Sequence, residues 1–515
     1  MGIRQGGSDL SIANGVREFA RATPGATAVI DGDRSLTYAA LDERASRLAN
    51  TLLSSGLSAG QRVAVLAGNR LEYCEIACGL AKAGLPMVPL NPRLTASEAG
   101  FIIEHSGASA LILDDGLAAA AAPSTEAGAF KLVLSIDGTT LGLDYEETLA
   151  ASGAADPRAD LAETEPFCIA YTSGTTGDPK GVMISHRSRS LTFYGAALEW
   201  GLGPGRRTIA VAPMYHGAGF AFGYAAVHVG GTVSMLRAWD PEAFLARIAT
   251  DRPHSVFLVP AHAQMLRALG EDALATADLA GLETLYFNAA ALPQPLKEWV
   301  LASAPGVGVH ELYGSTEAGI VTDLRPSDIA RKVSCVGVPW FMTELRVIDD
   351  DGNVVEGEGT GELFSRSPFL MNGYHDNPDA TAACTTDDGF LTAGDVVRVD
   401  DEGFVHIIDR KKDMIISGGT NVYPREVEDV LRRHPSVVDV GVVGATSETW
   451  GEEVAAFVVL AAGTDLDEAS LDAHCRQSLA GFKVPRRYRA VDALPRNAAG
   501  KVLKTDLRTQ LQDAG

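Results

Sequence analysis

The stretch YTSGTTGDPKG, residues Tyr171–Gly181, follows the apolar run FCIA and holds four Thr or Ser residues, three glycines and one lysine. Glycines let a backbone approach a ligand closely, and successive N–H groups and hydroxyls can converge on phosphate oxygens. A loop of this composition directly after a strand-like run predicts a phosphate-binding loop rather than a plain flexible turn. It is not a Walker A loop, because Lys180 follows Gly177 at the wrong spacing and Gly181 stands where that motif needs Ser or Thr.

Strand-like and helix-like segments alternate on both sides of this loop. Runs such as RVAVLAG and SVFLVPA alternate with segments such as YAALDERASRLANTLLSSG and PEAFLARIATD. The alternation predicts an α/β fold, with a large N-terminal domain of mainly parallel sheets flanked by helices. The composition changes at the polar cluster RKKD, so we expect the large domain over residues 1–410, a small α+β domain over residues 411–515 and a hinge near Lys412.

Length and charge narrow the class of protein. A chain of 515 residues with 46% hydrophobic residues can build two or more cores. The net charge of −23 argues against broad binding to nucleic acid or to anionic membranes. The six cysteines are scattered, so we expect buried thiols rather than a metal site. No leader or membrane span is recognisable, and we therefore expect a cytoplasmic protein. We expect a monomer or a homodimer.

Four further motifs follow the opening loop. They are ELYGSTEAG at Glu311–Gly319, TAGD at Thr392–Asp395, DRKKDMIISGGTNVYPREVE, and LPRNAAGKVLK close to the C-terminus. In this order, the five motifs resemble the adenylate-forming (AMP-binding) superfamily, which includes acyl-CoA synthetases, 4-coumarate:CoA ligases, firefly-type luciferases and the adenylation domains of peptide synthetases. The resemblance covers nearly the whole chain, and it implies a mobile C-terminal domain with the active site between the two domains.

The resemblance also implies the reaction and its small-molecule partners. Such enzymes let a carboxylate attack the α-phosphorus of ATP, which gives acyl-AMP and pyrophosphate, and a thiol then attacks the activated carbonyl. Both steps move negative charge among phosphate and carbonyl oxygens, so catalysis is chiefly positioning and electrostatic stabilisation. The expected cofactors are ATP, Mg²⁺ and coenzyme A, and the expected substrate is a carboxylic acid.

The resemblance implies a nucleotide site made of residues from these motifs. The residues implied for the β- and γ-phosphates are Thr172, Ser173, Gly174, Thr175, Thr176, Gly177 and Lys180. Those implied around the rest of the nucleotide are Asn288, Ala289, Ala290, Tyr313 stacked on adenine, Gly314, Ser315, Thr316 at the α-phosphate, Asp395 at the ribose and Arg410. Glu317 would hold Mg²⁺, a hard cation suited to carboxylate oxygen.

Other roles fall to the C-terminal domain. Lys501 would neutralise charge between the carboxylate and the α-phosphate in the first step, although an isolated GK pair would be read as a plain surface lysine. Rotation about Lys412 would then bring Gly418 and Gly419 to line a pantetheine tunnel. The candidates for docking the CoA nucleotide are Trp450, Phe482, Lys483 and Arg486.

The substrate-side motif is APMYHGAGF, which ends at Phe220. Adenylation domains for α-amino acids carry an Asp in this region, whereas His216 is typical of acyl- and aryl-CoA ligases; a purely structural histidine is the alternative. The implied pocket wall is aromatic or small and contains no Arg or Lys: Tyr215, His216, Gly219, Phe220, Phe222, Phe287, Ala289, Ala290 and Gly314. Burying an unpaired charge there would be costly, so we expect an apolar monocarboxylate, fatty or aromatic, and the exclusion of dicarboxylates such as malonate.

Two departures from the family pattern and two alternatives remain. Ala289 and Ala290 occupy glycine-like positions, and Ala393, before Gly394 and Asp395, replaces a hydroxyl-bearing residue. Neither departure removes a catalytic group. The alternatives to an acyl-CoA synthetase are an enzyme that loads a carrier-protein thiol with the acyl group, and an inactive homologue that acts as a binding or scaffold protein.

Overall fold

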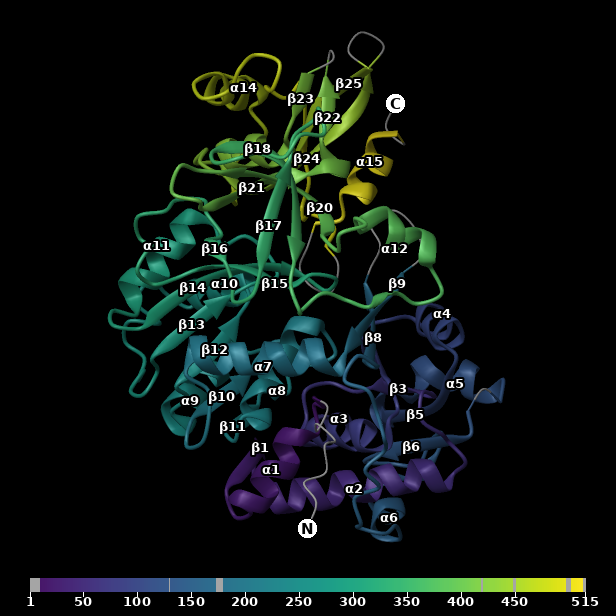
Figure 1. Ribbon diagram of the computed structural model, residues 1–515. Helices are drawn as coiled ribbons and strands as arrows, with labels where there is room; N and C mark the ends of the chain where they lie inside the picture. Colours follow the sequence, from purple (N-terminus) through teal and green to yellow (C-terminus); the bar gives the residue numbers. More distant parts are fainter. Residues whose placement is uncertain are drawn as a thin grey trace.

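Two mainly parallel sheets form the larger part of the molecule (Figure 1). The computed structural model describes residues 10–128, 130–172, 179–417, 420–447, 451–496 and 502–512. In spatial order, sheet A contains β16 (Val338–Pro339), β15 (Gly319–Leu324), β14 (Gly308–Ser315), β13 (Thr284–Phe287), β12 (Ser255–Leu258), β10 (Arg207–Ala210), β11 (Thr232–Met235), β1 (Thr27–Asp31) and β2 (Arg34–Thr37). Sheet B contains β19 (Gly373–Tyr374), β9 (Lys180–Ser185), β8 (Pro166–Thr172), β4 (Met87–Leu90), β3 (Arg62–Leu66), β5 (Ala108–Asp114), β6 (Leu132–Ile136) and β7 (Leu143–Asp144).

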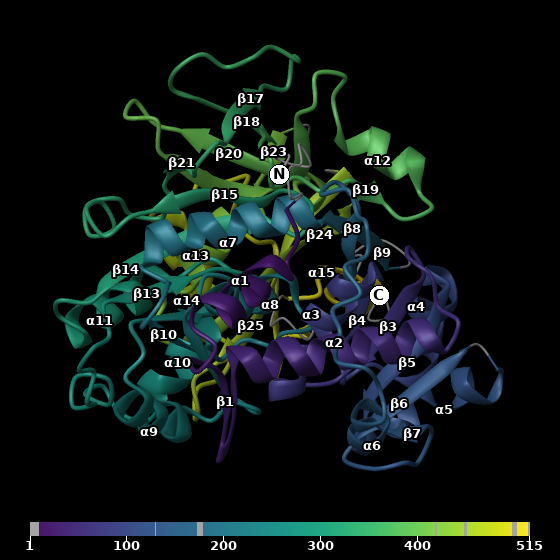
Figure 2. The same ribbon diagram turned by 60° about the horizontal axis from the view of Figure 1, so that its bottom comes forward.

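Helices connect and cover these strands. Those of the first part of the chain are α1 (Asn14–Ala22), α2 (Tyr38–Ser54), α3 (Leu71–Ala83), α4 (Ala96–Ser106), α5 (Ala118–Glu126), α6 (Tyr145–Ala150), α7 (His186–Trp200), α8 (Gly217–His228), α9 (Pro241–Asp251), α10 (Pro260–Ala268), α11 (Gln294–Ser303) and α12 (Pro378–Cys384). The largest hydrophobic core is shared by α2, α3, α7, α8 and strands of both sheets, with α7 and α8 side by side at the centre of the molecule (Figure 2). The predicted α/β architecture with mainly parallel sheets is therefore confirmed.

Two smaller sheets follow. Sheet C is antiparallel and contains β17 (Glu344–Ile348), β18 (Gly359–Arg366), β20 (Leu391–Val399) and β21 (Val405–Arg410). Sheet D contains β23 (Thr420–Val422), β22 (Ile415–Ser417), β25 (Gly451–Leu460), β24 (Val437–Ser447) and β26 (Arg487–Ala490), and it packs with α13 (Pro424–Leu431), α14 (Glu468–Arg476) and α15 (Lys504–Gln512). A 3₁₀ turn, Lys411–Asp413, joins the two sheets and contains the predicted hinge residue Lys412.

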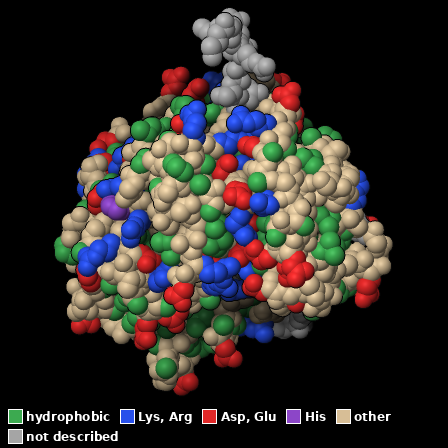
Figure 3. Space-filling model, turned by 90° about the horizontal axis from the view of Figure 1, so that it is seen from below, with side chains coloured by type: hydrophobic (Ala, Val, Ile, Leu, Met, Phe, Trp, Pro, Cys, Tyr) green, Lys and Arg blue, Asp and Glu red, His purple; other side chains and the backbone are tan. Residues whose placement is uncertain are grey.

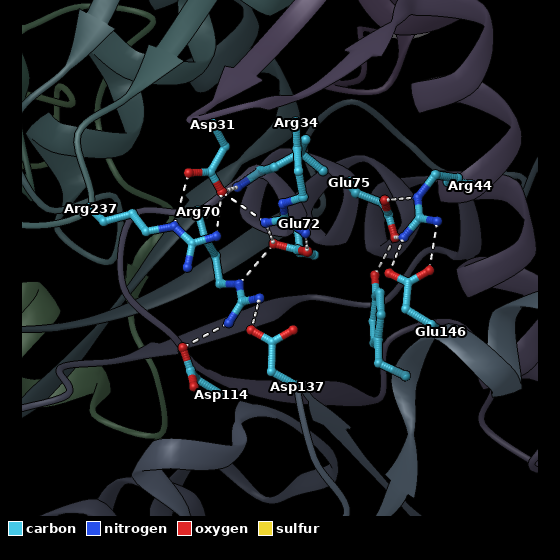
Figure 4. Close-up of polar contacts among 12 residues, drawn as sticks. Asp31, Arg34, Arg44, Arg70, Glu72, Glu75, Asp114, Asp137, Glu146 and Arg237 are labelled. Carbon is cyan, nitrogen blue, oxygen red and sulfur yellow. Dashed lines mark hydrogen bonds and ion pairs between the residues drawn. The ribbon is translucent and has the colours of Figure 1, made fainter. Parts of the chain in front are cut away.

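A network of charged side chains, some of them buried, connects sheet A to sheet B (Figure 4). Asp31 at the end of β1 accepts hydrogen bonds from Arg237 and Arg34, and Arg34 also pairs with Glu72 on α3. Arg70, which is only 2% exposed, pairs with Glu72 and with Asp114 and Asp137 of sheet B and its margin. The network therefore fixes the carboxyl ends of the strands of one sheet against those of the other.

The surface carries both signs of charge. On the face seen from below, acidic, basic and apolar side chains are interspersed (Figure 3). Such a mixture gives this face no field of a single sign. Within the described part of the chain, no helix combines the length and the apolar composition needed to cross a membrane.

Candidate functional site

The predicted phosphate loop joins the two strands of an antiparallel hairpin. The backbone of Thr172 at the end of β8 pairs with that of Lys180 at the start of β9, so the two ends of the loop lie side by side. Behind this base, the Tyr171 hydroxyl lies 2.7 Å from Nδ1 of His105 on α4. Ser173, Gly174, Thr175, Thr176 and Gly177 lie outside the described residues.

Lys180 and the predicted metal ligand Glu317 meet at a common neighbour, Tyr374. The Tyr374 hydroxyl donates a hydrogen bond to Glu317 Oε1 at 3.0 Å, and Lys180 Nζ lies 5.0 Å from the centre of the Tyr374 ring. Burial raises the pKa of Tyr374, and the Glu317 carboxylate raises it further, so the phenol stays a donor. This bond leaves the second carboxylate oxygen of Glu317 for a cation, and the donor type fits Mg²⁺.

A second cluster contains three of the residues assigned to the nucleotide. The Tyr313 hydroxyl donates to Asp395 Oδ2 at 2.5 Å, and Arg410 Nε lies 3.0 Å from Asp395 Oδ1. Asp395 is only 4% exposed, and β20 and β21 pair it directly with Arg410. Burial, with the nearby Asp395 carboxylate, raises the pKa of Tyr313. The cluster offers an aromatic ring beside a carboxylate, as an adenosine site requires.

The hairpin of β14 and β15 carries the motif ELYGSTEAG between these two clusters. Its turn is stabilised by Ser315 Oγ, which accepts a hydrogen bond from the N–H of Ala318 at 3.0 Å. Thr316 lies over the first turn of α8, since a Cβ atom added at Gly217 would be 3.9 Å from Thr316 Cγ2. A Cβ added at Gly314 would be only 2.0 Å from the Gly319 carbonyl oxygen, so this position needs glycine.

The loop Asn288–Leu292 is anchored by a buried ion pair. Glu311 on β14 accepts a hydrogen bond from the N–H of Leu292 at 3.0 Å, and its second oxygen lies 2.5 Å from Lys297 Nζ on α11. Both charged side chains are almost completely buried. Ala289 in this loop has φ +74°, in the left-handed region that favours glycine, whereas Ala290 has no such angle.

His216 precedes α8 and is presented by a loop that Asn69 holds. Asn69 Oδ1 accepts from the N–H of Met214 at 2.7 Å, and its Nδ2 lies within 3.3 Å of the carbonyl oxygens of Ala210, Ala212 and Leu236. Burial lowers the pKa of His216, and the positive charge of Arg93 lowers it further, so the ring is neutral at pH 7. Within the described residues, His216 Nε2 is buried and has no hydrogen-bond partner.

The residues of the predicted pocket wall lie in different surroundings. Tyr215 is half-buried beside His216, with ring centres 4.7 Å apart. Phe220 and Phe222 are 3% and 2% exposed and pack among other aromatic rings. Phe287 is only 1% exposed and lines a small apolar cavity with Phe244 and Trp299 on the other side of sheet A from Tyr286, so it is a core residue and not part of the wall.

A cation that is not among the predicted wall residues lies near Phe220. The guanidinium of Arg189 on α7 lies 5.9 Å from the centre of the Phe167 ring, and that ring stacks on Phe220 at 5.6 Å. Arg189 belongs to a different helix from Phe220 and lies outside the motif APMYHGAGF, so the linear pattern does not reveal that the two are neighbours.

Several residues are predicted to act from the C-terminal domain. Of these, Gly418, Gly419, Trp450 and Lys501 lie outside the described residues. Lys483 Nζ lies 2.7 Å from both carboxylate oxygens of Glu426, which offsets the positive charge assigned to CoA docking. Phe482 is 39% exposed and lies beside Lys483, while Arg486 is held through its backbone N–H by Val454.

Several residues of the site had no signal that the motifs could reveal. Tyr374 is in a short strand outside all five motifs, and Asn69 follows β3 more than a hundred residues before His216. Glu311 belongs to the motif ELYGSTEAG, but its partner Lys297 is an isolated lysine on α11. Tertiary contacts bring together Tyr374 and Glu317, Asn69 and Met214, and Glu311 and Lys297. A linear sequence pattern does not contain such contacts.

Comparisons with known proteins cover both parts of the chain. A family model described as AMP-binding enzyme matches residues 16–375, and one described as AMP-binding enzyme C-terminal domain matches residues 426–501. The chain is 37% identical over 494 residues to a feruloyl-CoA synthase of Amycolatopsis sp, covering 95% of this chain and 96% of that protein. It is 35% identical over 506 residues to a 2-succinylbenzoate–CoA ligase of Geobacillus kaustophilus, covering 97% and 98%. The structure resembles that of an amide bond synthetase from Marinactinospora thermotolerans, with a TM-score of 0.87, 30% identity and coverage of 97% and 99%.

Proposed function

The chain belongs to the AMP-binding enzyme family, and we propose on that basis that it is an ATP-dependent acyl-CoA synthetase. It would convert a carboxylic acid with an apolar body into its acyl-AMP and then into the CoA thioester, releasing pyrophosphate and AMP. The observation that carries the proposal is the position of Thr316 over the first turn of α8, which directly follows His216. The β14–β15 hairpin that carries Thr316 also carries Tyr313 of the Tyr313–Asp395–Arg410 cluster.

In the first step, a carboxylate oxygen of the acid attacks the α-phosphorus of ATP, and the bond to the pyrophosphate oxygen breaks. Asp395 would accept the ribose hydroxyls, Tyr313 would lie against the adenine, and Thr316 would donate to an α-phosphate oxygen. Mg²⁺ held by Glu317 would supply charge neutralisation for the phosphates. Lys180 and Lys501 would add positive charge where negative charge moves.

In the second step, the CoA thiolate attacks the acyl carbon, and the bond between that carbon and the AMP oxygen breaks. Movement of the C-terminal domain about Lys412 would replace Lys501 by Gly418 and Gly419 at the active site. The neutral His216 ring, whose Nε2 has no hydrogen-bond partner among the described residues, would lie beside the reacting carboxyl group.

The acid itself would be fatty or aromatic. Tyr215 and Phe220 are the aromatic residues nearest to His216 in the chain, and they favour apolar atoms next to the carboxyl group. A hydrophobic wall distinguishes neighbouring acids by only about 1–3 kcal/mol per methylene, so a graded preference is expected. A short diacid such as malonate would place its second charge against these rings and should be a poor substrate.

A panel of carboxylic acids tests the proposal. We expect acid-dependent exchange of pyrophosphate into ATP that needs Mg²⁺, and AMP formation that needs both the acid and CoA. No exchange with any acid would overturn the enzymatic proposal and leave the binding-protein alternative. Exchange without CoA-dependent AMP formation would instead favour transfer to a carrier-protein thiol.

A further inference from the structure

Arg189 lies on the inward-facing side of α7. Helical periodicity puts it on one face with Phe193, Ala196 and Trp200, all of which are at most 1% exposed. The opposite face carries Leu198 at 78% exposure and Tyr194 at 43%. An arginine on the buried face of a central helix is unusual, because arginine is seldom buried without a partner.

Within the described residues, Arg189 has no such partner. Its Nε atom is buried without a hydrogen-bond acceptor, and no carboxylate lies within ion-pair distance of its guanidinium. Burial lowers the pKa of Arg189 to about 10, with only the Cys168 thiol acting in the opposite direction. By contrast, Arg187 on the same helix is half-exposed and lies 3.4 Å from Glu163. A buried guanidinium without an acid is stabilised when an anion reaches it.

The residue is nevertheless only partly buried, so some of its surface stays accessible. Phe167 links it to a residue assigned to the acyl wall. The Arg189 guanidinium lies over the Phe167 ring, which stacks on Phe220 at an interplanar angle of 23°. Phe220 is one helical turn after His216, and its backbone N–H donates to the His216 carbonyl at 2.9 Å. Two aromatic rings therefore separate Arg189 from the position of the reacting carboxyl group.

We propose that Arg189 binds an anionic oxygen group, a second carboxylate, at the far end of the acid substrate. The inference rests on the proposed acyl-CoA synthetase activity and narrows its substrate class to acids with an apolar body and a distal carboxylate. A guanidinium can bind a carboxylate through two parallel N–H···O bonds. Malonate would still be excluded, because it is too short to reach from His216 past the Phe220 and Phe167 rings to Arg189.

The test compares acids of equal length with one or two carboxyl groups. Pyrophosphate exchange is measured for straight-chain monoacids and α,ω-diacids of about six to sixteen carbons, with the native protein, Arg189→Met and Arg187→Met. We expect the native protein to activate a long diacid at least as well as the matching monoacid. Arg189→Met should lower kcat/KM for that diacid by about 30- to 300-fold, mainly through KM, as expected for loss of one partner of a buried charge pair. Activity with the monoacid should be unchanged or raised.

Arg187→Met should leave both acids unaffected, and Arg189→Lys should restore part of the diacid activity, since it retains the charge without the paired donors. The inference is overturned if the native protein activates monoacids but no diacid, or if Arg189→Met impairs both kinds of acid equally. The monoacid reactions report on the proposed function separately, because they do not need Arg189. If Arg189→Met does not fold, the comparison of native protein with Arg189→Lys decides, since equal loss for both acids contradicts a distal carboxylate.

Discussion

Asn69 Oδ1 accepts a hydrogen bond from the backbone N–H of Met214 at 2.7 Å, although the two residues belong to loops of different sheets. The same side chain donates to the carbonyl groups that end β10 and β11. Because His216 follows Met214 by two residues, the orientation of the imidazole depends on an amide from the loop between β3 and α3. A buried amide that uses both its oxygen and its nitrogen fixes a loop more strictly than apolar packing does.

Replacing Asn69 by Leu should therefore damage the site as well as the fold. The change leaves the buried N–H of Met214 and several carbonyl groups unpaired, at a cost of about 2–4 kcal/mol in the free energy of unfolding. We expect kcat/KM for the acid to fall by about 10- to 100-fold. Urea unfolding and pyrophosphate exchange measure the two effects. Asn50→Leu is the control, because its amide also binds backbone carbonyls but far from His216, and equal losses in exchange would contradict a special role for Asn69.

The pair of Glu317 and Tyr374 predicts a graded response to Mg²⁺. Glu317→Gln keeps an acceptor for Tyr374 but removes the negative charge, so we expect exchange to fall by about 100-fold or more and the Mg²⁺ requirement to rise. Tyr374→Phe removes only one hydrogen bond and should cost about 3- to 10-fold. Titration of exchange activity with Mg²⁺ separates the two variants. An unchanged Mg²⁺ requirement in Glu317→Gln would show that the carboxylate does not hold the cation.

The two half-reactions should respond to different substitutions in the C-terminal domain. Lys501→Ala should abolish adenylate formation and leave thioester formation from preformed acyl-AMP nearly intact. Gly419→Trp should have the opposite effect, because an indole would fill the pantetheine tunnel. Both rates are measured separately, the first by pyrophosphate exchange and the second by CoA consumption with synthetic acyl-AMP. Impairment of the same half-reaction by both variants would contradict a rotation about Lys412.

The charge network between sheets A and B predicts a dependence of stability on pH. Arg237 and Arg34 hold the pKa of Asp31 at about 2, below its ordinary 3.8, even though burial acts in the opposite direction. Arg34 and Arg70 likewise hold the pKa of Glu72 at about 2, below 4.5. Because both folded-state pKa values are lowered, this stabilisation is complete above the unfolded values and is lost as the pH falls from about 5 toward 2.

Asp31→Asn should therefore reduce the free energy of unfolding at pH 7 by about 2 kcal/mol or more. Below pH 4, the difference in the free energy of unfolding between the variant and the native protein should shrink, because the native protein then loses the stabilisation that the ionised Asp31 carboxylate provides. Urea unfolding at several pH values between 3.5 and 7 gives both curves. A constant difference over this range would mean that the Asp31 carboxylate is not the group that titrates.

Much of the fold and part of the site follow from local sequence. The alternation of apolar runs and amphipathic segments specifies the parallel sheets, and the motif ELYGSTEAG places Tyr313, Thr316 and Glu317 on one hairpin. The positions of Asn69, Tyr374 and Arg189 do not follow, since each is defined by neighbours that are distant in the chain. The sequence pattern assigns Phe287 to the pocket wall because it lies close to the glycine-like positions Ala289 and Ala290. The alternation of side chains along β13 instead directs it into the core.

Ala289 combines a sequence departure with a backbone consequence. The sequence has Ala where relatives have a glycine-like position, and the structure gives this residue φ +74°, a conformation that costs an L-residue other than Gly about 1 kcal/mol. Ala289→Gly should therefore raise the free energy of unfolding by about 0.5–1 kcal/mol, despite the greater freedom of glycine in the unfolded chain. Ala290→Gly is the matched control, because its φ is not positive, and it should destabilise the protein by a similar amount.

The same position tests the acyl wall. If Ala289 limits the space near the reacting carboxyl group, Ala289→Trp should shift the preference toward shorter acids, while Ala289→Gly should favour bulkier ones. The indole cannot relieve the strain of φ +74°, so the variant should also be less stable than Ala289→Gly, and activity must be compared with kcat/KM ratios between acids rather than with total rates. A series of aliphatic and aromatic acids measures these ratios. If the native protein, Ala289→Trp and Ala289→Gly all give the same ratios, the Asn288–Leu292 loop does not face the acid. The loop, anchored by Glu311 and Lys297, would then serve the nucleotide alone.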